Sequence, residues 1–474
     1  MRGWEWVFLA AVTLAAAVLR LYQLGRVSPD PFYDAAVRSM SLSLHNFFLG
    51  AFEPGGSVSI DKPPVDLWLQ VVTVKILGFS STTLKLPEAL AGTAAVPALY
   101  AAVRKMWSPA AGAAAAVALA ILPVDVITSR SDTMDGVMML CLVIALLCIL
   151  EALERGSTRW LLGAAAVLGV AFNVKLLESL IAVPGLVVFA WVGLPGPRSR
   201  RALQIALAAV VWVAVSLSWL TATLLVPAHE RPWAIGSTNG SAWNAAFVFN
   251  GTDRLGSKSP EPQFTVYQPG HRYAQSTQSE RDRIPIVPTS PTRLLSRIGP
   301  LSGERLGMEL LAAILLGIPA LLAGTGLLDR LGVGRRRGDR TPHGPPDAQD
   351  SDQRRFRLAA AAGLSVWLVS GIVLFSEQAR LHPRYVEAFT PAVAAVLGIG
   401  AAWAAQARGR LRLATLTVAM LAVVYYAERL MYGRTPTWWI VLLCALGALA
   451  LAVLERLPAP PSAPRALLPA AVLT

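Results

Sequence analysis

Apolar runs of membrane-spanning length recur along the chain and constrain its fold more than any other feature. A helix needs about 20 mostly apolar residues to cross the hydrocarbon core of a bilayer. Such runs lie near 4–23, 84–103, 109–127, 134–153, 160–173, 176–194, 203–226, 306–328, 357–375, 386–405, 412–427 and 436–455. We therefore expect an all-α polytopic membrane protein with about 12 transmembrane helices.

The composition excludes an ordinary soluble enzyme. Hydrophobic residues make up 54% of the 474 residues and charged residues only 15%, whereas soluble domains carry about 25% charged residues. The net charge of +13 would suit a nucleic-acid partner, but membrane proteins place Lys and Arg in their cytoplasmic loops. We expect no nucleic-acid partner. Cys141, Cys148 and Cys444 all lie in apolar runs, so neither a disulfide nor a metal site is predicted from them.

Alternate connections between the apolar runs are basic. They carry Arg104–Lys105, Arg155 with Arg159, Arg198 with Arg200–Arg201, Arg335–Arg337 with Arg354–Arg355, and Arg408 with Arg410 and Arg412. Because basic loops stay in the cytoplasm, both termini are predicted there. The long connections 24–83 and 227–303 then face outward, and loops of that length usually carry function. We expect one module over 1–456, with a flexible cytoplasmic loop at about 329–356 and a disordered Ala/Pro-rich tail over 457–474.

Ionisable residues gather at the outer ends of the predicted spans. Six stretches contribute them: Asp30 and Asp34; Asp61 and Lys62; Asp125; Arg130, Asp132 and Asp135; Lys175 and Glu178; and Glu377, Arg380, His382 and Arg384. Charges near membrane depth are costly and indicate function. A transporter would hold its charges near the midplane, so a polar cavity at one face favours an enzyme that acts on a lipid head group.

Two segments of the first outer connection combine acids with proline. Asp30 precedes an expected amphipathic helix that lies on the membrane, and it either caps that helix or acts as a general base. In Asp61-Lys62-Pro63-Pro64 the prolines bar a helix, so an acid and a base lie on a rigid turn. This pair is either a structural salt bridge or a contact for phosphate or sugar.

Two later clusters lie at the entrances of spans. Asp132 and Asp135, three residues apart, share one side of a helix start, where they either cap the helix or, with Arg130, bind sugar hydroxyls. The segment Arg380-Leu381-His382-Pro383-Arg384-Tyr385 is unusually basic for an outer loop, and arginine forks match phosphate oxygens. The histidines lack metal-ligand spacing, so a divalent metal is left open and not indicated.

The order of these motifs resembles a known family. An acid-bearing outer loop, Asp61-Lys62-Pro63-Pro64, Ser129–Asp135, Phe172–Lys175, Arg231-Pro232-Trp233 and His382–Tyr385 follow one another as in bacterial relatives of the protein O-mannosyltransferases. That group includes the lipid A aminoarabinose transferases and belongs to the GT-C superfamily. The resemblance covers about residues 1–405. It implies a glycosyltransferase of the bacterial plasma membrane that takes its sugar from a polyprenyl-phosphate donor at the outer face.

The resemblance also implies a catalytic acid just after the first span, at Asp30. The family often has a second acid directly beside it, but here Pro31 follows and the next acid is Asp34, so the base is Asp30 or Asp34. We expect Lys62, Lys175, Arg380 and Arg384 to bind donor phosphate. Sugar or acceptor contacts are expected from Asp61, Arg130, Asp132, Asp135, His382 and Tyr385.

We expect a single displacement that inverts the anomeric carbon. The acceptor would be an envelope glycan, lipid or protein hydroxyl. A retaining reaction would need Asp132 or Asp135 as nucleophile. The alternative from another class is a transporter or flippase of lipid-linked sugar precursors.

Overall fold

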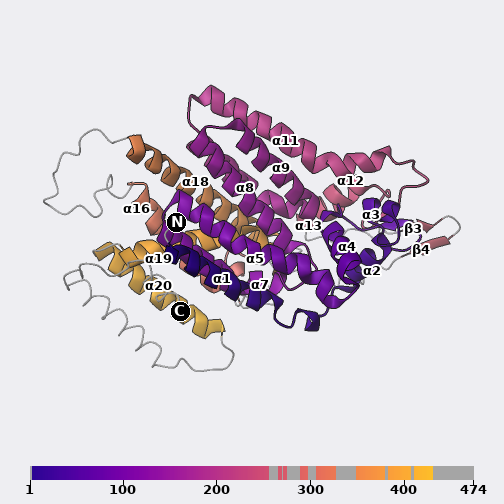
Figure 1. Ribbon diagram of the computed structural model, residues 1–474, viewed down its shortest axis with the longest axis horizontal. Coiled ribbons are helices and arrows are strands. Elements are labelled where there is room, and N and C mark those ends of the chain that lie inside the picture. Colours follow the sequence, from indigo (N-terminus) through magenta and orange to yellow (C-terminus); the bar gives the residue numbers. More distant parts are fainter. Residues whose placement is uncertain are drawn as a thin grey trace.

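The computed structural model describes residues 3–255, 265–268, 271–274, 289–296, 306–326, 348–378, 383–406 and 410–430. Within these ranges the chain is mainly helical (Figure 1). Nine helical segments of the described part are long and apolar enough to span a membrane. They correspond to α1 (Gly3–Leu21), α5 (Ser81–Met106), α8 (Asp135–Arg155), α9 (Thr158–Lys175), α11 (Arg198–Leu225), α15 to α16 (Gly307–Gly324), α18 (Ala348–Glu377) from Asp352 onward, α19 (Thr390–Gln406) and α20 (Arg410–Leu430) from Leu411 onward. The expected polytopic all-α class is confirmed.

Two of the predicted spans are shorter than the sequence suggested. The run at 109–127 divides into α6 (Pro109–Ile121) and α7 (Pro123–Thr128), because Pro123 disfavours a helical backbone at the residue before it. The run at 176–194 begins as a 3₁₀ segment, η2 (Leu176–Ile181), and becomes α10 only at Val183–Gly193. The run at 436–455 and the tail 457–474 lie outside the described residues.

The expected loop at about 329–356 is also shorter, because α18 already begins at Ala348.

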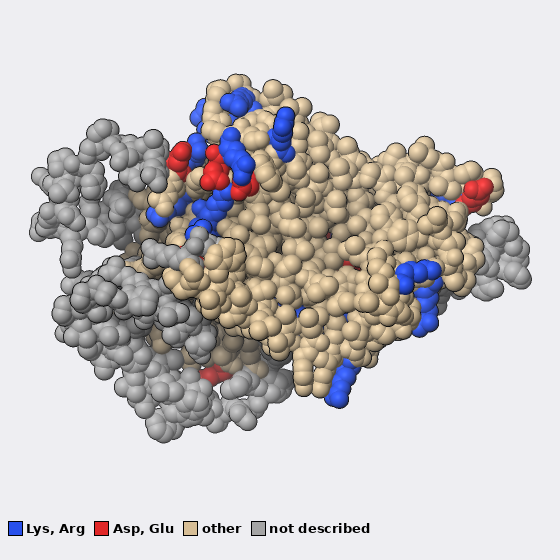
Figure 2. Space-filling view, in the orientation of Figure 1, with Lys and Arg blue, Asp and Glu red and all other residues tan. Residues whose placement is uncertain are grey.

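Small residues allow the spans to approach closely. A Cβ on Gly185 of α10 would lie 2.6 Å from the backbone oxygen of Gly363 in α18, and small residues at such crossings are typical of membrane helices. Figure 2 shows a broad belt almost without charged side chains across the middle of this face, as expected for a surface in contact with lipid.

The basic connections after α5 and after α8 lie together at one end of the bundle. Arg104 at the end of α5 pairs with Glu5 of α1 at 3.4 Å, and Lys105 pairs with Glu151 and Glu154 of α8. These ion pairs join helix ends that the charge pattern assigned to the same side. The predicted alternation of the connections therefore agrees with the arrangement of these three helices.

The opposite end carries the two long connections (Figure 1). The first contains α2 (Pro31–Met40), α3 (Leu44–Leu49), β1 (Val58–Ser59) and α4 (Val65–Leu77); the second contains β2 (Trp233–Ala234), α12 (Ala242–Asn244), the π-helical η3 (Ala245–Thr252), α13 (Asp253–Leu255), β3 (Thr265–Gln268) and β4 (His271–Ala274). β1 pairs with β2 in parallel, and β3 pairs with β4 antiparallel. The β1–β2 pair fastens the two connections to each other. As expected, α2 is amphipathic, with Tyr33, Ala36, Val37 and Met40 buried.

Candidate active site

Asp30 lies directly before α2 and contacts two different segments. Its backbone is extended, and its carboxylate accepts a hydrogen bond from the backbone N–H of Phe32 at 3.0 Å, so it caps the helix. Its own backbone N–H donates to both carboxylate oxygens of Asp132, at 3.1 and 3.0 Å. The capping interpretation of Asp30 is thus correct as geometry, and the residue is in addition held against the start of α8.

Asp34 lies one helical turn further along α2, in a different environment. Its carboxylate pairs with Arg38 at 3.3 Å, and the Arg38 side chain is 63% exposed. The Arg38 guanidinium also lies over the ring of Phe79, 3.6 Å from its centroid. Of the two acids proposed as base, the structure therefore brings Asp30 to Asp132 and ties Asp34 to an exposed cation.

Asp132 is almost fully buried in the connection between α7 and α8. Burial raises the pKa of its carboxyl group to about 6, although the hydrogen bond from the Asp30 N–H acts in the opposite direction. Its backbone oxygen accepts a hydrogen bond from the side chain of Gln70 in α4 at 3.2 Å. Asp132 is thus fixed from both sides.

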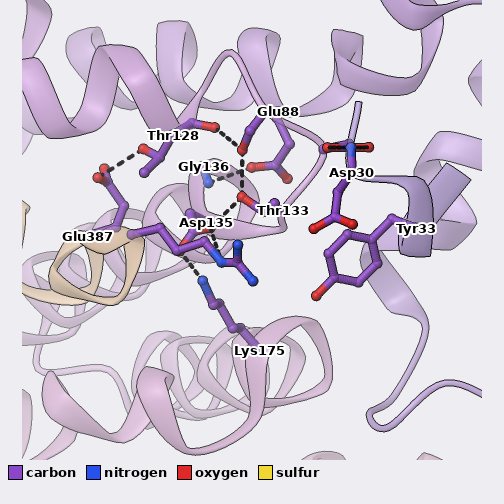
Figure 3. Close-up of polar contacts among 12 residues, drawn as sticks. Asp30, Tyr33, Glu88, Thr128, Thr133, Asp135, Gly136, Lys175 and Glu387 are labelled. Carbon is purple, nitrogen blue, oxygen red and sulfur yellow. Dashed lines mark hydrogen bonds and ion pairs between the residues drawn. The ribbon is translucent and has the colours of Figure 1, made fainter. Parts of the chain in front are cut away.

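Asp135, the first residue of α8, forms a buried ion pair with Lys175 at the end of α9 (Figure 3). Thr133 donates to its second carboxylate oxygen at 2.8 Å, and the Nε of Arg384 lies 4.0 Å from that oxygen. The Lys175 ammonium lies 5.1 Å from the ring centroid of Tyr385. Four residues predicted for the site, Asp135, Lys175, Arg384 and Tyr385, are thus brought together.

Backbone strain flanks this ion pair on both sides. Met134, which precedes Asp135, has φ of 67°, and Leu176, which follows Lys175, has φ of 45°. Residues other than glycine adopt positive φ at a cost of about 1–3 kcal/mol each, and such strain is concentrated at functional sites. The ends of α8 and α9 are therefore held in one arrangement by their surroundings.

The Asp61-Lys62 turn lies beside Tyr33 of α2. The Lys62 ammonium pairs with Asp61 at 3.3 Å and donates to the Tyr33 hydroxyl at 3.0 Å. Burial lowers the pKa of Lys62, but Asp61, Tyr33 and Tyr385 raise it more, and the net shift is upward. Lys62 therefore stays protonated, as a phosphate ligand must.

Arg254 in α13 joins the same group, although no sequence motif indicates it. Its guanidinium donates to Asn250 at 3.0 Å, and Asn250 in turn donates to the carboxylate of Asp61 at 3.1 Å. Burial lowers the pKa of Arg254, but Tyr385, Asp61 and Glu178 raise it, with a net upward shift. Arg254 is therefore a cation within electrostatic range of residues from both outer connections.

Other predicted site residues are not part of this group. Arg130 donates to the backbone oxygen of Leu19 at 2.7 Å, so it contacts the end of α1. Arg380 and His382 lie outside the described residues. Among the described ranges, no group of three or more His, Cys, Asp or Glu side chains could hold a metal ion.

Buried carboxyl groups that were not selected from the sequence lie behind the site. Glu88 of α5 contacts Asp66 of α4. Glu387 contacts Asp125, which pairs with Arg20 of α1. Glu88 lies inside an apolar run. A charged residue in such a run is costly, so the position of Glu88 in the sequence could have identified it as a candidate.

Comparison with known proteins confirms the resemblance to mannosyltransferases. Residues 61–219 match the model of a family described as dolichyl-phosphate-mannose-protein mannosyltransferase. Two relatives come from Bacillus subtilis (strain 168) and are provisionally named as mannosyltransferases. YycA is 35% identical over 248 residues, and YkcB is 32% identical over 250 residues. The structure is similar to that of ArnT from Cupriavidus metallidurans in the apo state, with a TM-score of 0.52 and 18% identity, which supports a shared fold.

These similarities cover different parts of the proteins. Each Bacillus alignment includes 52% of this chain but only 36% of YycA and 35% of YkcB. The superposition on ArnT includes 96% of this chain and 70% of that one. The family model begins at Asp61, so it includes Lys62, Asp132, Asp135 and Lys175 and leaves out Asp30.

Proposed function

We propose that the chain is a membrane glycosyltransferase that moves a sugar from a polyprenyl-phosphate-linked donor to an acceptor hydroxyl. The observation that carries the proposal is the gathering of Asp30, Lys62, Arg254 and Arg384 around one end of the helical bundle. The description of the matching family favours this class of donor, and the names of the Bacillus relatives make mannose the first sugar to test.

The cations supply the binding site for the donor phosphate. The Nε of Arg384 has no hydrogen-bond partner among the described residues, so it can donate to a phosphate oxygen. Lys62 and Arg254 approach from the two outer connections and add positive charge. Lys175 contributes less directly, because its ammonium is already paired with Asp135.

Asp30 acts as the general base in this proposal. It takes the proton from the acceptor hydroxyl as that oxygen attacks the anomeric carbon. The bond between the anomeric carbon and the phosphate oxygen breaks, and its electron pair leaves with the polyprenyl phosphate, whose charge Lys62, Arg254 and Arg384 stabilise. Because Asp132 and Asp135 are buried and already hydrogen-bonded, a single inverting displacement is favoured over a covalent intermediate.

The site faces the extracytoplasmic side of a bacterial plasma membrane in this proposal, with both termini in the cytoplasm. The basic connections and the site occupy opposite ends of the bundle, and basic connections remain cytoplasmic. A flippase of lipid-linked sugars is the second class considered. It needs a polar route across the bilayer, whereas the charges of the candidate site gather at one end, which favours the transferase.

The test is mass spectrometry of envelope glycans, lipids and proteins from cells with and without the protein, complemented by the wild type or by Asp30→Asn. We expect one glycosylated product to disappear and to return only with the wild type. Identical profiles with and without the protein would contradict the proposal. Restoration by Asp30→Asn would favour the flippase, which needs no base.

A further inference from the structure

Two carboxyl groups meet behind the candidate site, inside the protein. Asp66 comes from the first turn of α4 and Glu88 from α5, and both residues are 0% exposed. Their side chains are in direct contact with each other. Carboxyl groups are almost never fully buried unless they are paired, so this contact requires an explanation.

The hydrogen-bond donors around the pair reach only one oxygen of each carboxyl group. Gln70 donates to one oxygen of Asp66 at 2.7 Å, and the backbone N–H of Gly136 donates to one oxygen of Glu88 at 2.6 Å. The remaining oxygens, Oδ1 of Asp66 and Oε1 of Glu88, have no donor among the described residues. Two ionised carboxylates only accept hydrogen bonds, so a contact between them needs a proton.

The neighbouring charged groups do not remove the requirement for a proton between the two carboxyl groups. The charged groups Asp135 and Lys175 act on Asp66, but they are already paired with each other. Asp135 also adds a second negative charge near Glu88. Since like charges and burial both disfavour ionisation of a carboxyl group, one proton on the pair is the arrangement that satisfies both side chains.

The pair joins three elements that carry the candidate site. Glu88 holds the first turn of α8 through Gly136, where a Cβ would lie only 2.9 Å from the Glu88 backbone oxygen and 3.0 Å from its carboxylate. Gln70, which donates to Asp66, also donates to the backbone oxygen of Asp132. Asp132 in turn receives the backbone N–H of Asp30.

We propose that Asp66 and Glu88 share a single proton and act as positioning residues, which hold Asp132 and, through it, Asp30 in the geometry needed for transfer. The positioning effect on sugar transfer rests on the proposed function. The shared proton is independent of that function, because it follows from burial and from the balance of hydrogen-bond donors and acceptors alone.

The shared proton is tested by infrared spectroscopy of the purified full chain. We expect the wild type to show the carbonyl band of a buried protonated carboxylic acid. In Asp66→Asn and in Glu88→Gln an amide supplies the donor and the remaining carboxylate is ionised, so both difference spectra should show loss of that band. Persistence of the band in both variants would overturn the proposal, whether or not the protein transfers sugar.

The positioning effect is tested by kinetics with polyprenyl-phosphate mannose as donor. Glu88→Gln keeps a donor within the pair and should retain most of the wild-type kcat. Glu88→Ala should lower kcat about tenfold or more with little change in the KM of the donor, because a shift of about 1 Å can cost about 100-fold in rate. Glu151→Ala, at the opposite end of the bundle, is the matched control and should leave kcat unchanged.

Melting temperatures identify variants that fail to fold. If Glu88→Ala is unfolded, Glu88→Gln and Asp66→Asn test the positioning effect. Both keep a donor within the pair and should stay active, and loss of kcat in both folded variants would overturn the positioning effect. Full activity in a folded Glu88→Ala variant would overturn the positioning effect. A wild type without transfer activity would count against the proposed function, and the infrared result would still decide the shared proton.

Discussion

The backbone N–H of Asp30 donates to both carboxylate oxygens of Asp132, although the two residues are 102 positions apart. This contact joins the connection after α1 to the connection before α8. Because Asp132 is buried and also held by Gln70, it gives Asp30 a fixed support. The position of the proposed base therefore depends on the α4–α5–α8 region as well as on α2.

The raised pKa of Asp132 predicts a pH dependence of stability. Folding raises this pKa from 3.8 to about 6, so between these values the folded state binds more protons than the unfolded state. Stability from this group is then greatest at low pH and falls as the pH rises from about 4 to about 6. We expect the melting temperature of the wild type, relative to Asp132→Asn, to decrease over this range. A difference that stays constant or increases would contradict the assignment.

Arg384 should contribute strongly to donor binding. Arg384→Ala should weaken the affinity for polyprenyl-phosphate mannose about 10- to 100-fold, since a hydrogen bond to a charged group contributes about 1.5–3 kcal/mol. Arg384→Lys should recover only part of this, because an ammonium cannot replace the two-pronged guanidinium. Binding is measured with purified protein, and Arg159→Ala, at the opposite end of the bundle, is the control. Unchanged affinity in a folded Arg384→Ala variant would exclude this function.

Arg254 should matter for the donor in the same way, although only the structure brings it to the site. Arg254→Gln keeps a hydrogen-bond donor for Asn250 and removes the positive charge. We expect the KM of the donor to rise about tenfold with a smaller change in thermal stability. If KM is unaffected and only stability falls, Arg254 serves to hold the second outer connection in place.

The sequence was sufficient for properties that depend on local patterns. In the described part of the chain, apolar runs predicted most of the spans. Alternating charge predicted that the ends of α1, α5 and α8 lie together, and the order of the motifs predicted the similarity to mannosyltransferases. Asp30, Lys62 and Asp132 were selected because ionisable groups at helix ends are unusual in a membrane protein.

Contacts between segments that are distant in the chain could not be predicted from local sequence patterns. Arg254 reaches the site because β1 pairs with β2 and because Asn250 contacts Asp61, and no periodicity in 227–303 indicates either contact. The partner of Lys175 was equally hidden, since Asp135 lies on another helix. The ion pair of Asp34 with Arg38 spans a single helical turn, so helical spacing could have indicated it.

Opposite ends of the bundle should face opposite sides of the membrane. In a variant without Cys141, Cys148 and Cys444, we expect Ser241→Cys to react with a membrane-impermeant thiol reagent on intact cells. Ser199→Cys, among the basic residues of the first turn of α11, should react only after the membrane is opened. Labelling of both positions from the same side would contradict the alternating topology and the outward-facing site.

The choice between Asp30 and Asp34 as the base gives the sharpest test of the site. Asn caps a helix as well as Asp does, so Asp30→Asn should keep α2 and the backbone contact with Asp132 while losing the ability to accept a proton. Transfer should then fall by about two to four orders of magnitude with donor affinity nearly intact.

Asp34→Asn removes only an exposed ion pair with Arg38, which contributes about 0–1 kcal/mol, so its rate should stay near that of the wild type. Both variants are assayed for sugar transfer and for donor binding under the same conditions. The reverse pattern, with Asp30→Asn active and Asp34→Asn inactive, would move the base to Asp34.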